Sequence, residues 1–485
     1  MMKYKNIIEK LKEYDLVEFY DDIDIEFTYL SYNSTDVIDD ALFICKGTEF
    51  KKSYLEDAIE KGATCYVSEK DYNLNVPKII VKDVRCALAV LSSLFYPDNL
   101  FKIGITGTKG KTTTNYFIHN ILKNHLGYEP GIFATHYFYT GKTSGENHLT
   151  TPESLELHKY LNEMEEENLK YMSMEVSSQA EYHKRVFGMK FDIGCFLNIS
   201  EDHISPLEHK NFDEYLNCKL EFLKKCDTVI VFKHTDCYEK VIETVKNKKI
   251  ITFGYSKDCD YIIKNIINND GLSFELEHNN KTQIYEISMA GRFNVINACC
   301  AIIVSNLLGA TYDSILKGLL ETEVSGRMNV IKGGICPIIV DYAHNELSAK
   351  ALYESLKEDY PNKKIKVVFG CPGDKGVNRR RDMGTLAGEY ADYIYLTAED
   401  PGHLKVREIC EDIASYIEKY HHNYEIIEDR ETAIRKAISD STKDDVIALL
   451  GKGDENYQII NGKWIPYETD SVIVKKELSK IKENS

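Results

Sequence analysis

The sequence has no apolar run long enough to cross a membrane, and its start has no apolar signal core. A membrane-spanning helix needs about 18 or more apolar residues in succession, and no stretch of the chain approaches that length. Segment 1–16, MMKYKNIIEKLKEYDL, mixes charged and apolar residues in a pattern that predicts an amphipathic helix. We therefore expect a soluble protein of the cytoplasm.

An excess of basic residues is also lacking. Lysine and arginine number 60 against 77 acidic residues, so the net charge is −17 at pH 7. This balance argues against a protein that binds nucleic acid through a broad basic surface. Small anionic ligands remain compatible with it, because a local cluster of lysines, arginines and backbone N–H groups can hold them.

The cysteines show no pairing pattern. There are 13 of them, an odd number, and none forms a CxxC pair, while Cys299 and Cys300 are adjacent within an apolar run. The spacing favours reduced thiols in the core of a cytosolic protein over zinc sites or disulfides. Short-period repeats and low-complexity segments are absent as well.

The order of apolar and polar segments predicts three α/β domains. Residues 1–97 carry short strands and helices, and FYPDN (95–99) interrupts the pattern. From residue 98 to 325 strands alternate with helices, as in a parallel sheet wrapped by helices, and the Asn-rich stretch 268–290 predicts antiparallel hairpins. A third alternating block fills 326–485. We expect a small N-terminal domain followed by two α/β domains of the type that binds nucleotides at the carboxyl ends of the strands.

A glycine-rich loop joins the predicted strand 101–106 to the predicted helix 111–125. It departs from the general phosphate-loop pattern, because Ile105 stands where a glycine is usual. Lys111 would reach the β- and γ-phosphates of a nucleotide, and the Thr112 hydroxyl would bind Mg²⁺. The alternative is a glycine turn that only links strand to helix. The residues expected to contact phosphate are Gly107, Thr108, Lys109, Gly110, Lys111, Thr112 and Thr113.

Two further predicted strands end in side chains that can bind a metal ion. SMEVSS leaves Glu175 at one strand end, and LNISEDHIS leaves Asp202 and His203 at another. If these ends face the loop, they can complete the coordination of Mg²⁺ that Thr112 begins. Lys219 follows on a predicted helix among apolar residues, and its spacing alone predicts an ammonium that extends along the helix into solvent.

Together these segments resemble the Mur ligase family, the ATP-dependent enzymes that add amino acids to UDP-N-acetylmuramic acid. The similar segments are GTKGKTTT, TTPESLEL, MEVSSQAEYHKRV, DHISPLEHKNFDEYLNCK, GRFNVINA, SGRMNV, VDYAHNE and LLGKGDENYQ. Several resemble the branch that extends UDP-N-acetylmuramoyl-L-alanyl-D-glutamate. The resemblance implies three domains: an N-terminal domain that binds UDP, a central phosphate-loop ATPase domain and a Rossmann-like C-terminal domain. It also implies two steps, in which ATP phosphorylates a carboxylate and an amine then displaces the phosphate from the acyl phosphate.

The resemblance also implies roles for individual residues. Lys111, Glu175, His203 and Lys219 would form the catalytic set. Lys219 would be a carbamate formed with CO₂ (N6-carboxylysine), and it would hold two Mg²⁺ ions together with Thr112, Glu175 and His203. ATP would also contact Asn294, Asn297, Arg327, Asp341 and His344. The UDP-linked substrate would contact Ser34, Thr150, Thr151, Ser177, His183 and Arg185. The alternatives are helix capping for the threonines and Ser177, and a surface charge for Arg185.

The choice of amino acid is predicted from the third domain. Enzymes of this branch that add diaminopimelate carry Asp-Asn-Pro-Arg where this chain reads Glu399-Asp400-Pro401-Gly402. Gly402 has no side chain to pair with a second carboxylate, whereas acidic residues suit an ammonium group, so we expect L-lysine or another diamino acid. His403 or Lys405 could supply a replacement cation. The residues expected to meet the amino acid are Lys375, Glu399, Asp400, Gly451, Asp454 and Glu455.

Four other interpretations remain open at this point. One is a diaminopimelate-adding ligase of the same branch, and another is a ligase that extends folate or poly-γ-glutamate. A nucleotide-dependent switch or motor is disfavoured, because the chain has no guanine-reading Asn-Lys-x-Asp sequence. A non-catalytic regulator would not need the whole catalytic set. We expect a monomer that binds small molecules and no nucleic acid.

Overall fold

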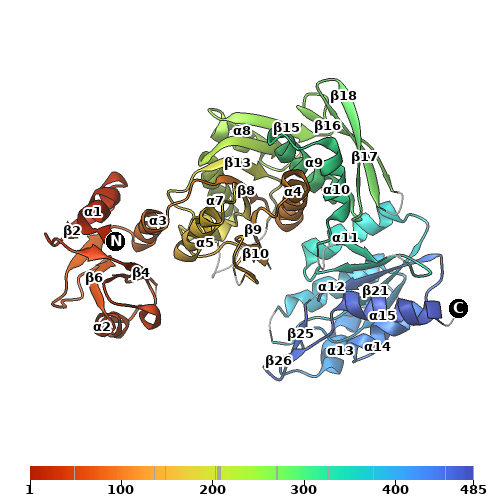
Figure 1. The fold of residues 1–485 in the computed structure, drawn as a ribbon. Coiled ribbons are helices and arrows are strands. Elements are labelled where there is room, and N and C mark those ends of the chain that lie inside the picture. The colour runs from red at the N-terminus through yellow and green to blue at the C-terminus, as the bar shows by residue number, and fades with distance from the viewer. Residues whose placement is uncertain are drawn as a thin grey trace. The chain divides into compact units, whose positions relative to one another are not determined.

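The computed structural model describes residues 1–47, 50–135, 137–147, 149–201, 204, 209–268, 271–324, 328–331, 333–374, 376–453 and 455–483. The chain divides into two compact units (Figure 1). Met1–Ile262 and Cys299–Gly318 form the first unit, and Ile263–Ala298 and Leu319–Ser485 form the second. The domain bounds near residues 97 and 325 stay predictions.

The first unit begins with a small α/β sheet in the order β2-β7-β6-β5-β4, parallel except for β2. Helices α1 and α3 supply Ile7, Leu11 and Leu88 to its buried core. The elements are β1 (Met2–Lys3), α1 (Tyr4–Glu13), β2 (Val17–Tyr20), β3 (Glu26–Phe27), β4 (Tyr29–Ser31), the 3₁₀ turn η1 (Ser34–Asp36), β5 (Ala41–Ile44), α2 (Lys52–Glu60), β6 (Ala63–Ser68), β7 (Lys78–Val81) and α3 (Val84–Phe95).

The larger sheet of the first unit runs β11-β10-β9-β12-β8-β13-β14-β15, and Tyr261 and Ile262 of β16 pair with β15. Strands β9, β12, β8, β13, β14 and β15 are parallel to one another, so their carboxyl ends share one edge. The elements are β8 (Phe101–Thr106), α4 (Lys111–Leu126), β9 (Gly131–Ala134), β10 (Tyr137–Tyr139), β11 (Ser144–Gly145), α5 (Ser154–Glu166), β12 (Tyr171–Glu175), α6 (Ser178–Tyr182), β13 (Phe191–Phe196), α7 (Phe212–Lys224), β14 (Cys226–Phe232), α8 (Tyr238–Val245), β15 (Lys249–Gly254) and β16 (Tyr261–Asn268).

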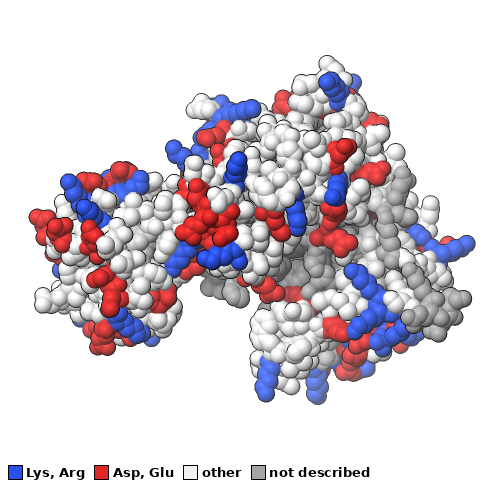
Figure 2. Space-filling model, in the orientation of Figure 1, with Lys and Arg blue, Asp and Glu red and all other residues white. Residues whose placement is uncertain are grey.

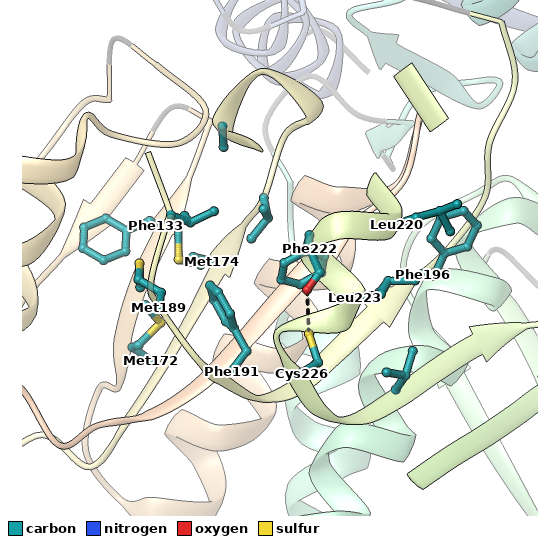
Figure 3. Packing of buried hydrophobic residues seen from close by; sticks show 14 of the residues in the cluster. Phe133, Met172, Met174, Met189, Phe191, Phe196, Leu220, Phe222, Leu223 and Cys226 are labelled. Carbon is teal, nitrogen blue, oxygen red and sulfur yellow. Dashed lines mark hydrogen bonds between the residues drawn. The ribbon is translucent and has the colours of Figure 1, made fainter. Parts of the chain in front are cut away.

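A cluster of buried aromatic and sulfur-containing side chains packs α7 onto this sheet (Figure 3). Phe191 of β13 and Phe222 of α7 lie edge to face, with ring centroids 5.1 Å apart. Gly104 of β8 allows this approach, because a Cβ atom there would lie 2.5 Å from Cζ of Phe222. Lys219 precedes Phe222 by three residues and lies on the same face of α7. The packing thus directs Lys219 toward the loop after β8.

The second unit contains a β-hairpin and a Rossmann-like sheet. Strands β17 and β18 pair antiparallel, which confirms a hairpin in 268–290. The sheet order is β19-β20-β24-β21-β22-β23, parallel except for β19. The elements are β17 (Leu272–His278), β18 (Lys281–Ile287), β19 (Asn329–Ile331), β20 (Ile338–Asp341), α11 (Glu346–Asp359), β21 (Lys364–Phe369), α12 (Asn378–Tyr390), β22 (Tyr393–Leu396), α13 (Val406–Ile417), β23 (Tyr424–Ile426), α14 (Arg430–Ser439), β24 (Asp445–Leu450), β25 (Tyr457–Ile460), β26 (Lys463–Pro466) and α15 (Asp470–Glu483). Helices α9 (Arg292–Leu307) and α10 (Tyr312–Glu321) contribute residues to both units.

The prediction of reduced thiols in the core agrees with this structure. All 13 cysteines are free thiols, and most are buried. In the described part of the chain, no helix combines the length and apolar character of a membrane span. Figure 2 shows lysines and arginines scattered among acidic side chains on the visible face.

Candidate active site

The loop after β8 is hydrogen-bonded to the segment that follows β13. Asn198, just after β13, accepts a hydrogen bond from the Lys109 N–H at 2.9 Å and donates to the Lys109 carbonyl at 3.1 Å. The hydroxyls of Thr108 and Tyr215 lie 2.9 Å apart. Lys111 is the first residue of α4, and its Nζ donates to the carbonyls of Gly107 at 2.8 Å and Thr108 at 3.0 Å. The Lys111 ammonium is therefore held within the predicted phosphate loop.

Glu175 ends β12 and is 1% exposed. Its Oε2 accepts a hydrogen bond from Thr112 Oγ1 at 3.1 Å, and its Oε1 accepts one from the Thr135 N–H at 2.8 Å. The Thr135 hydroxyl also donates to this carboxylate. The loop and the ends of β9 and β12 thus bring a carboxylate and two hydroxyls together, as predicted for Thr112 and Glu175.

The prediction from spacing that Lys219 extends into solvent is wrong. Lys219 is 2% exposed, and its Nζ donates to the Gly107 carbonyl at 2.9 Å. The same ammonium lies 4.6 Å from the ring centroid of Tyr215. Because Lys111 donates to the same carbonyl oxygen, two lysine side chains from separate helices meet at the loop.

Several predicted site residues lie outside the described residues. They are Asp202, His203, Arg327, Lys375 and Asp454. Among the residues that the structure describes, no group of three or more His, Cys, Asp or Glu side chains is arranged to hold a metal ion. The metal site therefore stays a prediction, and so does the role of His203.

The side chains predicted to hold the muramoyl substrate form a second cluster in the first unit. Thr151 is fully buried, and its hydroxyl donates to the Glu175 carbonyl at 2.9 Å and lies 3.4 Å from the Ser177 hydroxyl. Ser177 Oγ accepts from the Ala180 N–H, so it caps α6, as the capping alternative predicted. Thr150 is half-buried.

Arg185 is not a surface charge. It is 9% exposed, and it donates to Glu153 Oε1 at 2.8 Å and to the Thr151 carbonyl at 3.2 Å. Lys46 forms an ion pair with the same glutamate. Burial alone would raise the pKa of Glu153, but Lys46 and Arg185 outweigh it, so the pKa is lowered.

Two other predicted substrate contacts lie on turns. His183 follows α6, and its Nδ1 contacts Nη1 of Arg85 on α3. Ser34 opens η1, and its carbonyl accepts a hydrogen bond from Lys61 at 3.0 Å. The UDP contact of Ser34 stays a prediction.

The second unit holds the other predicted nucleotide contacts. Asn297 donates to Asn294 Oδ1 at 3.0 Å, and both side chains are buried. Asp341 ends β20 and accepts hydrogen bonds from the N–H groups of Met328 and Ala343, both at 2.7 Å. His344 Nδ1 donates to the Tyr342 carbonyl at 2.8 Å. Their contacts with ATP stay predictions.

The acidic residues predicted to meet the amino acid surround a buried lysine. Lys452 is fully buried and donates to Asp400 Oδ1 at 3.0 Å and to Glu455 Oε2 at 2.6 Å. The hydroxyls of Tyr342 and Tyr457 donate to the other oxygen of Glu455. Two of the predicted acids are therefore already paired within the protein.

Glu399 differs from these two acids. It is 7% exposed, and among the described residues it makes no hydrogen bond or ion pair. It packs against Gly451, where a Cβ atom would lie 2.7 Å from Glu399 Oε2. Burial raises the pKa of Glu399 to about 7. The site therefore offers one buried carboxyl group without a hydrogen-bond partner in the described chain.

Sequence reasoning missed four residues that build these clusters. Thr135 and Asn198 lie in none of the segments that resemble the family, and Tyr215 lies in one of them without a role that the sequence indicates. The roles of all three depend on which strand and helix ends become neighbours. Lys452 was detectable, since it lies within the GKGDE segment that carries Gly451 and Glu455. The two contacts of its ammonium group, with Asp400 and Glu455, were not evident from the pattern.

Comparison with known proteins places two family matches on the chain. Residues 105–305 match the Mur ligase middle domain, and residues 326–453 match the glutamate ligase domain of Mur ligases. The chain is 37% identical to a UDP-N-acetylmuramoyl-L-alanyl-D-glutamate–L-lysine ligase of Streptococcus thermophilus, over 99% of this chain and 100% of that protein. It is 38% identical to the enzyme of the same name from Enterococcus faecalis, over 94% and 92% of the two chains.

Solved structures share the fold. A UDP-N-acetylmuramoyl-L-alanyl-D-glutamate–2,6-diaminopimelate ligase is 25% identical, with a TM-score of 0.71 over 94% of this chain and 95% of that chain. The MurF ligase from Thermotoga maritima in complex with ADP is 17% identical, with a TM-score of 0.58 over 94% and 98% of the two chains.

Proposed function

Because this chain belongs to the Mur ligase family, we propose that it joins L-lysine to UDP-N-acetylmuramoyl-L-alanyl-D-glutamate, with conversion of ATP to ADP and phosphate. The observation that carries the proposal is the meeting of Lys111 and Lys219 at the Gly107 carbonyl, beside the Thr112–Glu175 pair. The full-length similarity to relatives named for this reaction supports the substrates.

The first proposed step brings two anions together. A carboxylate oxygen of the substrate attacks the γ-phosphorus of ATP, the bond to the bridging oxygen breaks, and ADP leaves. Lys111 neutralises phosphoryl oxygens as negative charge moves onto them. Its place at the start of α4 supports this role, because helix N-termini favour phosphate. The 17%-identical Thermotoga relative was solved with ADP, which is compatible with ATP as the phosphate donor.

The second proposed step forms the amide. The α-amine of lysine attacks the acyl carbon, the C–N bond forms, the C–O bond to phosphate breaks, and the nitrogen loses a proton. ATP and the UDP-linked precursor are both small and soluble, so the proposal requires no membrane partner. We propose that the reaction takes place in the cytoplasm. A monomer would suffice for it.

The residues around the loop fit magnesium. Hydroxyls of Thr112 and Thr135 and the carboxylate of Glu175 are hard oxygen donors, which Mg²⁺ prefers. When bound, magnesium would supply positive charge to the phosphates. Lys219 lies beside the same loop, and addition of CO₂ to its neutral amine would form an N–C bond, release one proton and leave a carbamate whose two oxygens share one negative charge. Its burial supports this modification, because an exposed lysine would stay hydrated and charged.

The second unit supports lysine over diaminopimelate. Gly402 has φ +60°, and a Cβ atom there would lie 2.1 Å from Oδ2 of Asp374. That carboxylate is held by the N–H and ring of His403 at 3.1 and 2.9 Å. An arginine at position 402 would therefore meet both backbone strain and a fixed neighbour. Glu399 remains as the acid that an incoming ε-ammonium could pair with, since Lys452 occupies Asp400 and Glu455.

A panel of amines tests the proposal. Purified full-length protein is given ATP, Mg²⁺, UDP-N-acetylmuramoyl-L-alanyl-D-glutamate and either L-lysine, L-ornithine or meso-diaminopimelate, with ADP release and product mass recorded. We expect ADP release to require both the precursor and an amino acid, with kcat/KM for lysine at least about tenfold above that for diaminopimelate, as one charged hydrogen bond allows.

The same panel of amines, run with the Glu399→Gln variant, tests whether Glu399 determines the selectivity for lysine. We expect the KM for lysine to rise about tenfold while the KM for ATP is unchanged. Glu418→Gln is the matched control, because Glu418 is exposed in the same unit. Faster turnover of diaminopimelate than of lysine, or ADP release without any amino acid, would contradict the proposed function.

A further inference from the structure

A contact between helix α3 and the end of helix α6 has no role in the account so far. Arg85 is the second residue of α3, and its Nη1 contacts Nδ1 of His183, which directly follows α6. His183 is one of the residues predicted to hold the muramoyl substrate, whereas Arg85 belongs to no segment that resembles a family motif. Both residues are half-buried.

The chemistry of the two side chains decides which of them donates. A guanidinium group has only N–H donors and no acceptor. Nδ1 of His183 must therefore accept the hydrogen bond, so it carries no proton. A neutral imidazole protonated on one nitrogen then has its proton on Nε2. The contact selects one tautomer and leaves the Nε2–H as the only donor of the ring.

The surrounding charges favour the same neutral form. The charged side chains that act on His183 are Arg85, Arg185, Lys46 and Glu153, three cations and one anion. Burial, followed by Arg85 and Arg185, lowers the pKa of His183 to about 4, and Glu153 opposes this only in part. An anionic substrate that enters this cluster therefore meets two kinds of donor, charged groups and a neutral imidazole N–H.

We propose that Arg85 is a positioning residue for the UDP-linked substrate, which fixes His183 as the tautomer whose Nε2–H donates to a substrate oxygen. This inference rests on the proposed function for the identity of the substrate. Arg85 acts through His183 rather than on the reacting atoms. The contact also makes binding of the substrate in the central part of the first unit depend on a residue of α3.

The histidine ring can be observed directly in full-length protein labelled with ¹⁵N-histidine. Two-bond ¹H–¹⁵N spectra report which ring nitrogen carries the proton, and His183→Gln identifies the His183 signals by their loss. At pH 7 we expect the proton on Nε2 in the wild-type protein. In Arg85→Met we expect both tautomers and a pKa that rises from about 4 toward the ordinary value of 6.5. Arg85→Lys keeps a donor and should keep most of the effect.

The kinetic readout separates positioning from folding. In Arg85→Met we expect the KM for UDP-N-acetylmuramoyl-L-alanyl-D-glutamate to rise about tenfold, with kcat and the KM values for ATP and lysine changed less than about twofold. In a His183→Gln background, the same Arg85→Met substitution should raise this KM no further, because the residue through which it acts is gone.

Two results would overturn the inference alone: a wild-type spectrum with the proton on Nδ1, or an equal rise in KM with and without His183. A wild-type protein that does not turn over the precursor would instead overturn the proposed function and, with it, the substrate part of this inference. The spectrum needs no substrate, so the two failures are distinguishable.

Discussion

The Lys219 ammonium contacts the carbonyl oxygen of Gly107 and the ring of Tyr215. Its spacing on α7 predicted an exposed ammonium, because a lysine among apolar helical residues commonly reaches solvent. The contact with Gly107 joins positions 112 residues apart in the sequence, so no local pattern contains it. Only the resemblance to a ligase family predicted a functional lysine at this position. The structure shows that its side chain is buried, and its carbamate stays a prediction.

Replacement of Lys219 by methionine tests its role. Methionine keeps much of the side-chain length but has no amine to donate to Gly107 or to carry a carbamate. We expect kcat to fall about 100-fold or more, since removal of one group that stabilises a charged transition state has this effect. The measurement is steady-state ADP release at saturating lysine and precursor.

A control on the same helix separates this loss from damage to α7. Lys224 also lies on α7, and its side chain is 52% exposed beside Glu221. Lys224→Met should retain activity within about twofold, as a surface substitution. Activity of Lys219→Met within tenfold of wild type would show that the amine is dispensable.

At the scale of elements, the parallel strands were predictable and several of their neighbours were not. The apolar run at 101–106 predicted β8, because strands buried on both faces have continuous apolar sequences. Strand β19 is only Asn329–Ile331, too short for any periodicity to mark it. Thr135 was missed for a related reason, since its role depends on β9 being next to β12.

Helix α5 carries a buried histidine that makes stability depend on pH. His158 is 3% exposed, and both ring nitrogens are buried without a hydrogen-bond partner among the described residues. Burial lowers the pKa of His158 to about 4, with Asp98 opposing and Lys102 reinforcing the shift. The unfolded chain takes up a proton near pH 6.5, whereas the folded protein does so only near pH 4.

The contribution of neutral, buried His158 to the free energy of unfolding is therefore complete above pH 6.5, and it is lost as the pH falls toward 4. Between pH 7 and pH 5 we expect His158 to lower the free energy of unfolding by about 2 kcal/mol. His158→Leu should lack this loss, and urea unfolding of the unit that contains α5 measures it at both pH values. His422→Gln, an exposed histidine with a side chain 76% accessible, is the control. Equal pH dependence in His158→Leu and wild type would refute the assignment.

At the scale of the whole molecule, the net charge of the protein has the same sign as the charge of the phosphate-bearing ligands it is proposed to bind. The protein carries −17, yet two of its proposed substrates, ATP and the UDP-linked precursor, are anions. Local clusters resolve this difference: Lys111 and Lys219 meet at the loop after β8, while Lys46, Arg85 and Arg185 gather beside His183. Composition could exclude a broad basic surface but could not reveal these clusters. The similarity to the lysine ligase of Streptococcus thermophilus extends over 99% of this chain, so it includes the segments that carry both clusters.

The central claim is that ATP activates a carboxylate of the precursor as an acyl phosphate. The direct test uses UDP-N-acetylmuramoyl-L-alanyl-D-glutamate labelled with ¹⁸O in both carboxylates of the glutamate, together with ATP, Mg²⁺ and L-lysine. Inorganic phosphate is then analysed by mass spectrometry. The account predicts that each amide formed transfers one ¹⁸O atom to phosphate. Phosphate without ¹⁸O, released at the same rate as ADP, would contradict it.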